Sequence, residues 1–201
     1  EALCREALAR HPENMDLLFV LGGVCVQKQA FRKAVAVFQK YITVNRKEKA
    51  RPRFNLLQVD TYSYEDRAWN NIGMCQKQLG QPDRAADAFM HAIRCNPGEG
   101  VYYKNLAILF IEKGRLDRAV EAVQLALDQG TLNEDVRAVL FFIVEKQTQT
   151  GAFEQAIALL EAGLVVAPRD MRALTLLSDC YAKLGRIDAA VSGYRDVLEK
   201  A

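Results

Sequence analysis

The stretch "RAWNNIGMCQKQLGQPDRAADAF", residues 67–89, decides how this chain folds. It places Gly73 inside a helical pattern, where a glycine costs about 1 kcal/mol relative to alanine. A second glycine, Gly80, separates this pattern from a run that carries Ala85 and Phe89 four residues apart. We therefore predict two helices joined by a left-handed turn at Gly80, with Gly73 small because the two helices cross closely there.

The same pattern of residues recurs 34 positions further along the chain. The coinciding pairs are Trp69 and Tyr103, Gly80 and Gly114, Ala85 and Ala119, and Ala92 and Ala126. Gly151 and Gly185 repeat the spacing later in the chain. Internal repetition with this period indicates stacked helical hairpins. Asn14 and Asp170 stand where the first helix of a hairpin begins, and both are predicted to cap it.

On these residues the chain closely resembles the tetratricopeptide repeat family. The family pattern of Trp, Leu, Gly, Tyr, Ala, Phe, Ala and Pro is met at Trp69, Ile72, Gly73, Gln76, Ala85, Phe89, Ala92 and Pro97. Only Gln76 departs from it, because an aromatic residue is usual at that position. The resemblance implies an all-α fold, a right-handed solenoid of antiparallel helix hairpins with about five units and a partial one at the N-terminus.

The predicted units form a single tetratricopeptide-repeat array over residues 1–201. Their bounds are 1–14 for the partial unit, then 15–48, 66–99, 100–133, 137–170 and 171–201. The unit 137–170 starts late relative to the period, so we expect its first helix to begin early, near Asn133. The chain opens with Glu1 and ends without an obvious polar capping helix, so we expect it to be part of a longer array.

The segment 49–65, "KARPRFNLLQVDTYSYE", interrupts the period between two units. Insertions into repeats fall in loops on one face, often the binding face. Three interpretations stay open. The segment is a longer loop or an extension of the flanking helices, a docking or dimerising element because "FNLL" is apolar for a solvated loop, or a basic nucleic-acid or import patch.

Composition argues against several classes of function. The 201 residues are 50% hydrophobic with a formal net charge of +2, which favours a globular core and argues against nucleic acid as a partner. No apolar run reaches the roughly 18 residues of a membrane span. The five cysteines lack paired or metal-ligand spacing, so we expect free thiols that act as small apolar side chains in a reducing, cytoplasmic compartment. His11 and His91 are expected in a turn or at the surface, and no metal site, cofactor or catalytic constellation is predicted.

In the family, the first helices of the hairpins line a concave groove, so the resemblance assigns candidate partner-binding residues by position. They are Asn70, Asn71, Met74 and Lys77, then Lys104, Asn105 and Ile108, then Phe141, Phe142 and Glu145, and finally Arg172 and Leu176. Asn71 and Asn105 match sites of an asparagine ladder that contacts peptide backbone in arrays such as the arm of O-linked N-acetylglucosamine transferase. Lys77 and Lys104 would favour acidic side chains. Phe141 and Phe142 would accept an apolar anchor, although a different register of that unit would bury both rings.

The predicted function is a protein–protein interaction scaffold that binds a peptide segment of a partner in the concave groove. The alternative is a substrate-recruiting or regulatory arm of a larger enzyme, such as a glycosyltransferase. No small-molecule substrate is predicted. Self-association through the open repeat ends or the 49–65 insertion is a further expectation.

Overall fold

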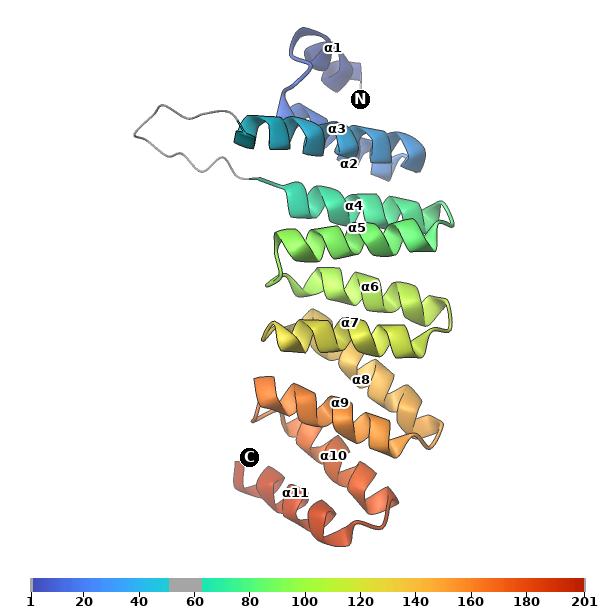
Figure 1. Ribbon diagram of the computed structural model, residues 1–201, viewed down its shortest axis with the longest axis vertical. Coiled ribbons are helices and arrows are strands. Elements are labelled where there is room, and N and C mark those ends of the chain that lie inside the picture. The colour runs from blue at the N-terminus through green and yellow to red at the C-terminus, as the bar shows by residue number, and fades with distance from the viewer. Residues whose placement is uncertain (1, 51–62, 201) are drawn as a thin grey trace, which may run out of the picture. The chain divides into compact units, whose positions relative to one another are not determined.

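The computed structural model describes residues 2–50 and 63–200, and within them all regular structure is helical (Figure 1). The helices are α1 (Ala2–Arg10), α2 (Met15–Gln27), α3 (Phe31–Ala50), α4 (Glu65–Gln78), α5 (Pro82–Cys95), α6 (Gly100–Glu112), α7 (Leu116–Asp128), α8 (Glu134–Gln149), α9 (Phe153–Val166), α10 (Met171–Lys183) and α11 (Ile187–Lys200). The all-α prediction is confirmed. Successive helices from α2 onward pack in pairs, α2 with α3, α4 with α5, and so on to α10 with α11.

The chain divides into two compact units, Glu1–Asn96 with α1 to α5 and Pro97–Ala201 with α6 to α11. Each unit is a stack of helical hairpins, in which the first helix of a pair is here called the A helix and the second the B helix. A single array over residues 1–201 stays a prediction. None of the described helices is both long and apolar enough to cross a membrane.

The ends of the helices follow the sequence signals. The side chain of Asn14 accepts a hydrogen bond from the Leu17 amide at 2.9 Å, and Asp170 caps α10 in the same way, which confirms both predicted N-caps. Asn133 caps α8, so the A helix of that hairpin begins early, as expected. Four glycines end A helices with positive φ, which confirms their predicted turn role; they are Gly80, Gly114, Gly151 and Gly185.

The crossing of α4 and α5 explains the glycine inside α4. A Cβ built on Gly73 would lie 2.6 Å from the ring of Phe89, closer than atoms tolerate. The first hairpin repeats this contact, with a Cβ on Gly22 placed 2.5 Å from the ring of Phe38. Both rings are fully buried, so neither has free space to retreat into. The predicted close approach at Gly73 is therefore confirmed.

We predict opposite effects for two helical glycines. Gly73→Ala should lower the free energy of unfolding by about 1–3 kcal/mol, because the new methyl group overpacks the buried Phe89 ring. Gly23→Ala should raise it by up to about 1 kcal/mol, because a Cβ there meets nothing within 4 Å and alanine is the better helix former. Chemical denaturation of both variants measures the difference. Equal changes in the two variants would contradict the close-crossing argument.

Candidate functional site

The A helices carry the predicted binding residues, and in the first compact unit these lie on α4. Asn70, Asn71 and Lys77 are half-buried, and Met74 is 36% exposed. At the position of Asn71, the preceding A helix presents Val20, which is 52% exposed. This unit therefore offers amide groups, which can both donate and accept hydrogen bonds, beside exposed apolar side chains.

In the second compact unit, α6 carries the half-buried Lys104, Asn105 and Ile108. The Lys104 ammonium lies 2.5 Å from a carboxylate oxygen of Asp135 on α8. Both side chains are about a third exposed, so the pair adds little stability. The ion pair matters for ligand binding, because the Asp135 carboxylate offsets the positive charge of Lys104, which was predicted to attract acidic side chains. Asn71 and Asn105 belong to different compact units, so the asparagine ladder stays a prediction.

The two adjacent phenylalanines of α8 differ sharply in exposure. Phe141 is buried at 5% exposure, and the guanidinium of Arg172 from α10 covers its ring at 4.3 Å from the centroid. Phe142 is 40% exposed, with the Lys146 ammonium 5.6 Å from its ring centre. The interpretation that both rings accept a ligand therefore does not hold for Phe141, which anchors Arg172 instead. Of these two phenylalanines, Phe142 alone presents an exposed ring.

Carboxylates accompany this ring on the A helices of the second unit. Glu145, one turn after Phe142 on α8, is exposed, and its carboxylate accepts a hydrogen bond from Gln149. On α10, Leu176 is half-buried and Asp179 is exposed. Arg172 is exposed on the same helix despite its contact with Phe141. The face thus combines one apolar ring and an aliphatic side chain with two carboxylates, Glu145 and Asp179, and two cations, Lys146 and Arg172.

A hollow of about 600 Å³ lies beside the start of α10, and of the residues that line it only Arg172 is among the predicted binding residues. It is lined by Arg137, Ala167, Pro168, Arg169, Asp170, Met171 and Arg172. Arg137 lies 3.0 Å from a carboxylate oxygen of Asp170, without hydrogen-bond alignment of its Nε, and also pairs with Glu134 at 2.8 Å. These carboxylates offset much of the positive charge. The ion pair between Arg137 and Asp170 joins residues far apart in the sequence, so no local motif could reveal it.

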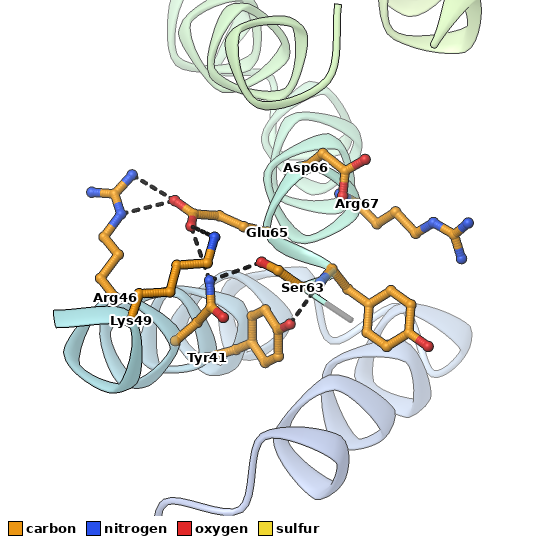
Figure 2. Close-up of polar contacts among 9 residues, drawn as sticks. Tyr41, Arg46, Lys49, Ser63, Glu65, Asp66 and Arg67 are labelled. Atoms are coloured by element: carbon orange, nitrogen blue, oxygen red, sulfur yellow. Dashed lines mark hydrogen bonds and ion pairs between the residues drawn. The ribbon is translucent and has the colours of Figure 1, made fainter. Parts of the chain in front are cut away.

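The inserted segment 49–65 falls mostly on residues 51–62, which lie outside the described part of the chain, so its three interpretations stay open. Its two ends are described, and they meet in a cluster that we call the α3–α4 polar cluster (Figure 2). The cluster consists of Tyr41, Asn45, Arg46 and Lys49 from α3 with Ser63, Tyr64 and Glu65.

Glu65 is the centre of the α3–α4 polar cluster and is only 7% exposed. One carboxylate oxygen accepts a hydrogen bond from Arg46 at 2.8 Å, and the other accepts one from Asn45 at 2.9 Å (Figure 2). The Lys49 ammonium is 3.6 Å from the second oxygen. Two cations and an amide therefore satisfy a carboxylate that could not be buried alone.

A second contact ties the same C-terminal end of the insertion to α3. The Tyr64 backbone amide donates a hydrogen bond to the Tyr41 hydroxyl at 2.9 Å, and burial raises the pKa of Tyr41. Arg46 also lies over the ring of Trp69, which stacks on His91 at 4.2 Å. His91 is therefore half-buried and stacked, contrary to the expected surface position. Burial lowers the pKa of His91, and the charges of nearby arginines add to this effect.

The thiols show no metal-binding arrangement among the described residues, and none of the five is in a disulfide. Cys25, Cys75 and Cys180 are buried apolar side chains, as expected. Cys95 differs, because it is exposed at the end of α5. Burial raises the pKa of Cys75 to about 11, with a smaller contribution from Cys25. Buried, protonated thiols are poor nucleophiles.

Comparison with known families identifies the class of protein. Models described as tetratricopeptide repeat match residues 1–52, 66–99 and 147–201, and together they span most of the chain. The chain belongs to the tetratricopeptide repeat family. The comparison with curated protein sequences finds no match.

Solved structures agree with this fold. YrrB, described as a TPR protein with an unusual peptide-binding site, is 15% identical with a TM-score of 0.54, over 98% of this chain and 91% of that one. A MamA protein is 17% identical with a TM-score of 0.53, over 94% and 92% of the two chains. A tetratricopeptide repeat protein from Parabacteroides merdae is 14% identical with a TM-score of 0.53, over 98% of this chain and 71% of that one. At these identities the likeness shows the fold alone.

We expect the α3–α4 polar cluster to stabilise the first compact unit. Glu65→Gln should lower the free energy of unfolding by about 1–2 kcal/mol, because it removes charge-assisted hydrogen bonds from a buried group whose cationic partners are half-exposed. Glu134→Gln is the matched control, since its carboxylate is 90% exposed and pairs with Arg137. It should change stability by less than about 0.5 kcal/mol. Chemical denaturation tests both, and comparable losses would show that burial of Glu65 is not the cause.

Alkylation should separate the thiols by burial. At pH 8 about one Cys75 thiol in a thousand would be ionised at a pKa of about 11, so this residue should label slowly in the native protein. Cys95 should label first because it is exposed. Timed alkylation followed by mass spectrometry measures the order, and denatured, unreduced protein should show five reactive thiols. Labelling of Cys75 as fast as Cys95 would contradict the burial of Cys75.

Proposed function

We propose that this chain is a protein-interaction scaffold whose A helices bind a peptide segment of a protein partner. The exposed ring of Phe142 carries this proposal. A large aromatic side chain is exposed on an A helix while its neighbour Phe141 is buried and covered. Exposed aromatic side chains on a binding face are the usual energetic centres of protein interfaces.

The charges around Phe142 favour a particular kind of peptide. Glu145 follows the ring by one turn, and Asp179 is exposed on the next A helix. Lys104 is already paired with Asp135, so it does not contribute an unopposed positive charge. The Lys146 ammonium, 5.6 Å from the Phe142 ring, and the exposed Arg172 add positive charge to the same face. We infer that the segment bound by the second unit carries an apolar anchor for Phe142 and Leu176, with charged residues of both signs beside it. Charge complementarity of this kind mainly sets specificity and association rate.

The first compact unit supplies a different chemistry. Asn70 and Asn71 lie side by side in the sequence on α4, near the exposed Met74. An amide side chain matches the alternating donors and acceptors of an extended peptide backbone. We propose that these amides hold backbone while Met74 and Val20 contact side chains of the ligand.

The family supports this proposal in general terms. Tetratricopeptide repeats are typical of proteins that recruit other proteins, and YrrB, which shares the fold, is described as having an unusual peptide-binding site. Free, mostly buried thiols support a reducing compartment for this chain.

Peptide selection tests the function directly. A library of random peptides displayed on phage would be selected on the protein, and the recovered peptides titrated against folded variants. Phe142→Ala should weaken binding by about 1–3 kcal/mol, a 5- to 150-fold rise in Kd, mainly through faster dissociation. Lys104→Ala should change Kd less than Phe142→Ala does, because Asp135 compensates its charge.

Val165→Ala provides the control for Phe142→Ala. Val165 is 81% exposed but lies on α9, a B helix, so its removal should leave peptide affinity unchanged. Selected peptides should carry an aromatic or aliphatic residue with charged residues of both signs beside it. If binding survives Phe142→Ala, Asn70→Ala and Asn71→Ala alike, the peptide site is not on these A helices.

A further inference from the structure

The last helix, α11, exposes a stripe of apolar side chains. The α11 stripe consists of Ile187, Val191, Tyr194 and Leu198, which are 59%, 50%, 37% and 79% exposed. Their spacing of four, three and four residues places them on one face of the helix. The Tyr194 hydroxyl donates a hydrogen bond to Asp179 of α10, which holds this ring in place on the face.

Equivalent positions on the other B helices of the same compact unit are covered. Counted from the glycine that precedes each B helix, they are Phe153, Ile157, Leu160 and Leu164 on α9, and Leu116, Val120, Val123 and Leu127 on α7. All eight are buried or half-buried, and Leu160 and Val123 are at most 1% exposed. The α11 stripe is therefore built like an interior helix surface, yet among the described residues it has no cover.

We propose that the α11 stripe is the contact between two copies of this chain, with the two α11 helices packed antiparallel about a two-fold axis. Residue numbers that add to the same total face each other in such a pair. Ile187 then lies opposite Leu198 of the second copy, and Val191 lies opposite Tyr194 of the second copy. The stripe is thus complementary to itself, which a two-fold interface requires.

Charges beside the stripe match the same arrangement. Asp188 and Arg195 are both exposed, and they lie along one edge of the stripe, seven residues apart. The numbers of Asp188 and Arg195 add to 383, two less than the total of 385 for the stripe pairs. Asp188 therefore lies about 3 Å along the helix axis from direct opposition to Arg195 of the second copy, within reach of its long side chain, and symmetry forms the pair twice. Along the opposite edge, Ala190 is buried and Val197 half-buried, so that edge faces the protein's own fold. The charged edge is the side that a second copy would meet.

Analytical ultracentrifugation of the 1–201 chain over a range of concentrations tests this contact. The chain should form a dimer whose dissociation constant rises at least about tenfold in Val191→Glu and in Leu198→Glu, because each buries a carboxylate at the interface. Val165→Glu is the matched control, since this side chain is 81% exposed on α9 outside the stripe. It should leave the dimer unchanged, and circular dichroism would confirm that each variant is folded.

Charge reversal tests the antiparallel arrangement itself. Asp188→Arg and Arg195→Asp should each weaken the dimer, because each opposes like charges across the interface. The double variant should restore dimerisation, since it exchanges the two partners. A chain that stays monomeric at every concentration would overturn the proposal and leave the stripe to a helix of another protein or of a longer chain. A dimer that persists in Val191→Glu, or that the double reversal fails to restore, would overturn the pairing of α11 with α11.

Discussion

The close crossing of paired helices is the constraint on which the first compact unit depends. Gly22 and Gly73 lack side chains where the rings of Phe38 and Phe89 pack, and both rings are fully buried. An aromatic ring on one helix packs directly against a glycine on its partner helix. The two backbones can therefore approach closely while the interior stays densely packed. The helix propensity lost at each glycine is therefore offset by the packing of the aromatic ring that fills the space beside it.

This constraint explains how much of the fold could be predicted from the sequence. Helix ends, the crossing and the turns depend on single residues with strong local preferences, such as Asn14 at a cap and Gly80 in a left-handed turn. The period then repeats these signals along the chain. Even the late fourth hairpin was predictable, because Asn133 is a good cap four residues before residue 137, where the repeat pattern places the start of that unit.

The candidate site was predicted less well, since its properties depend on contacts between hairpins. Sequence position placed Phe141 and Phe142 together, but Phe141 is buried and its ring is covered by Arg172 from the following A helix, whereas Phe142 is exposed. The pairing of Lys104 with Asp135 has the same origin. Glu65 shows this most clearly, because its hydrogen bond to Asn45 links residues on opposite sides of the insertion. No local pattern contains such information.

The B helices show why the sequence also leaves the end of the stack ambiguous. The apolar stripe of α9 is core because α10 packs beside α9, whereas the same register on α11 has no such neighbour among the described residues. A repeat specifies the side chains of a surface but not whether that surface is covered. Asp188 has acidic counterparts at the same register, Asp117 on α7 and Glu154 on α9. Arg195 instead stands where α7 has Gln124 and α9 has Glu161, so this cation is what distinguishes the exposed edge of α11. Selection for a specific contact at this end would therefore appear in the charges beside the stripe more than in the stripe itself.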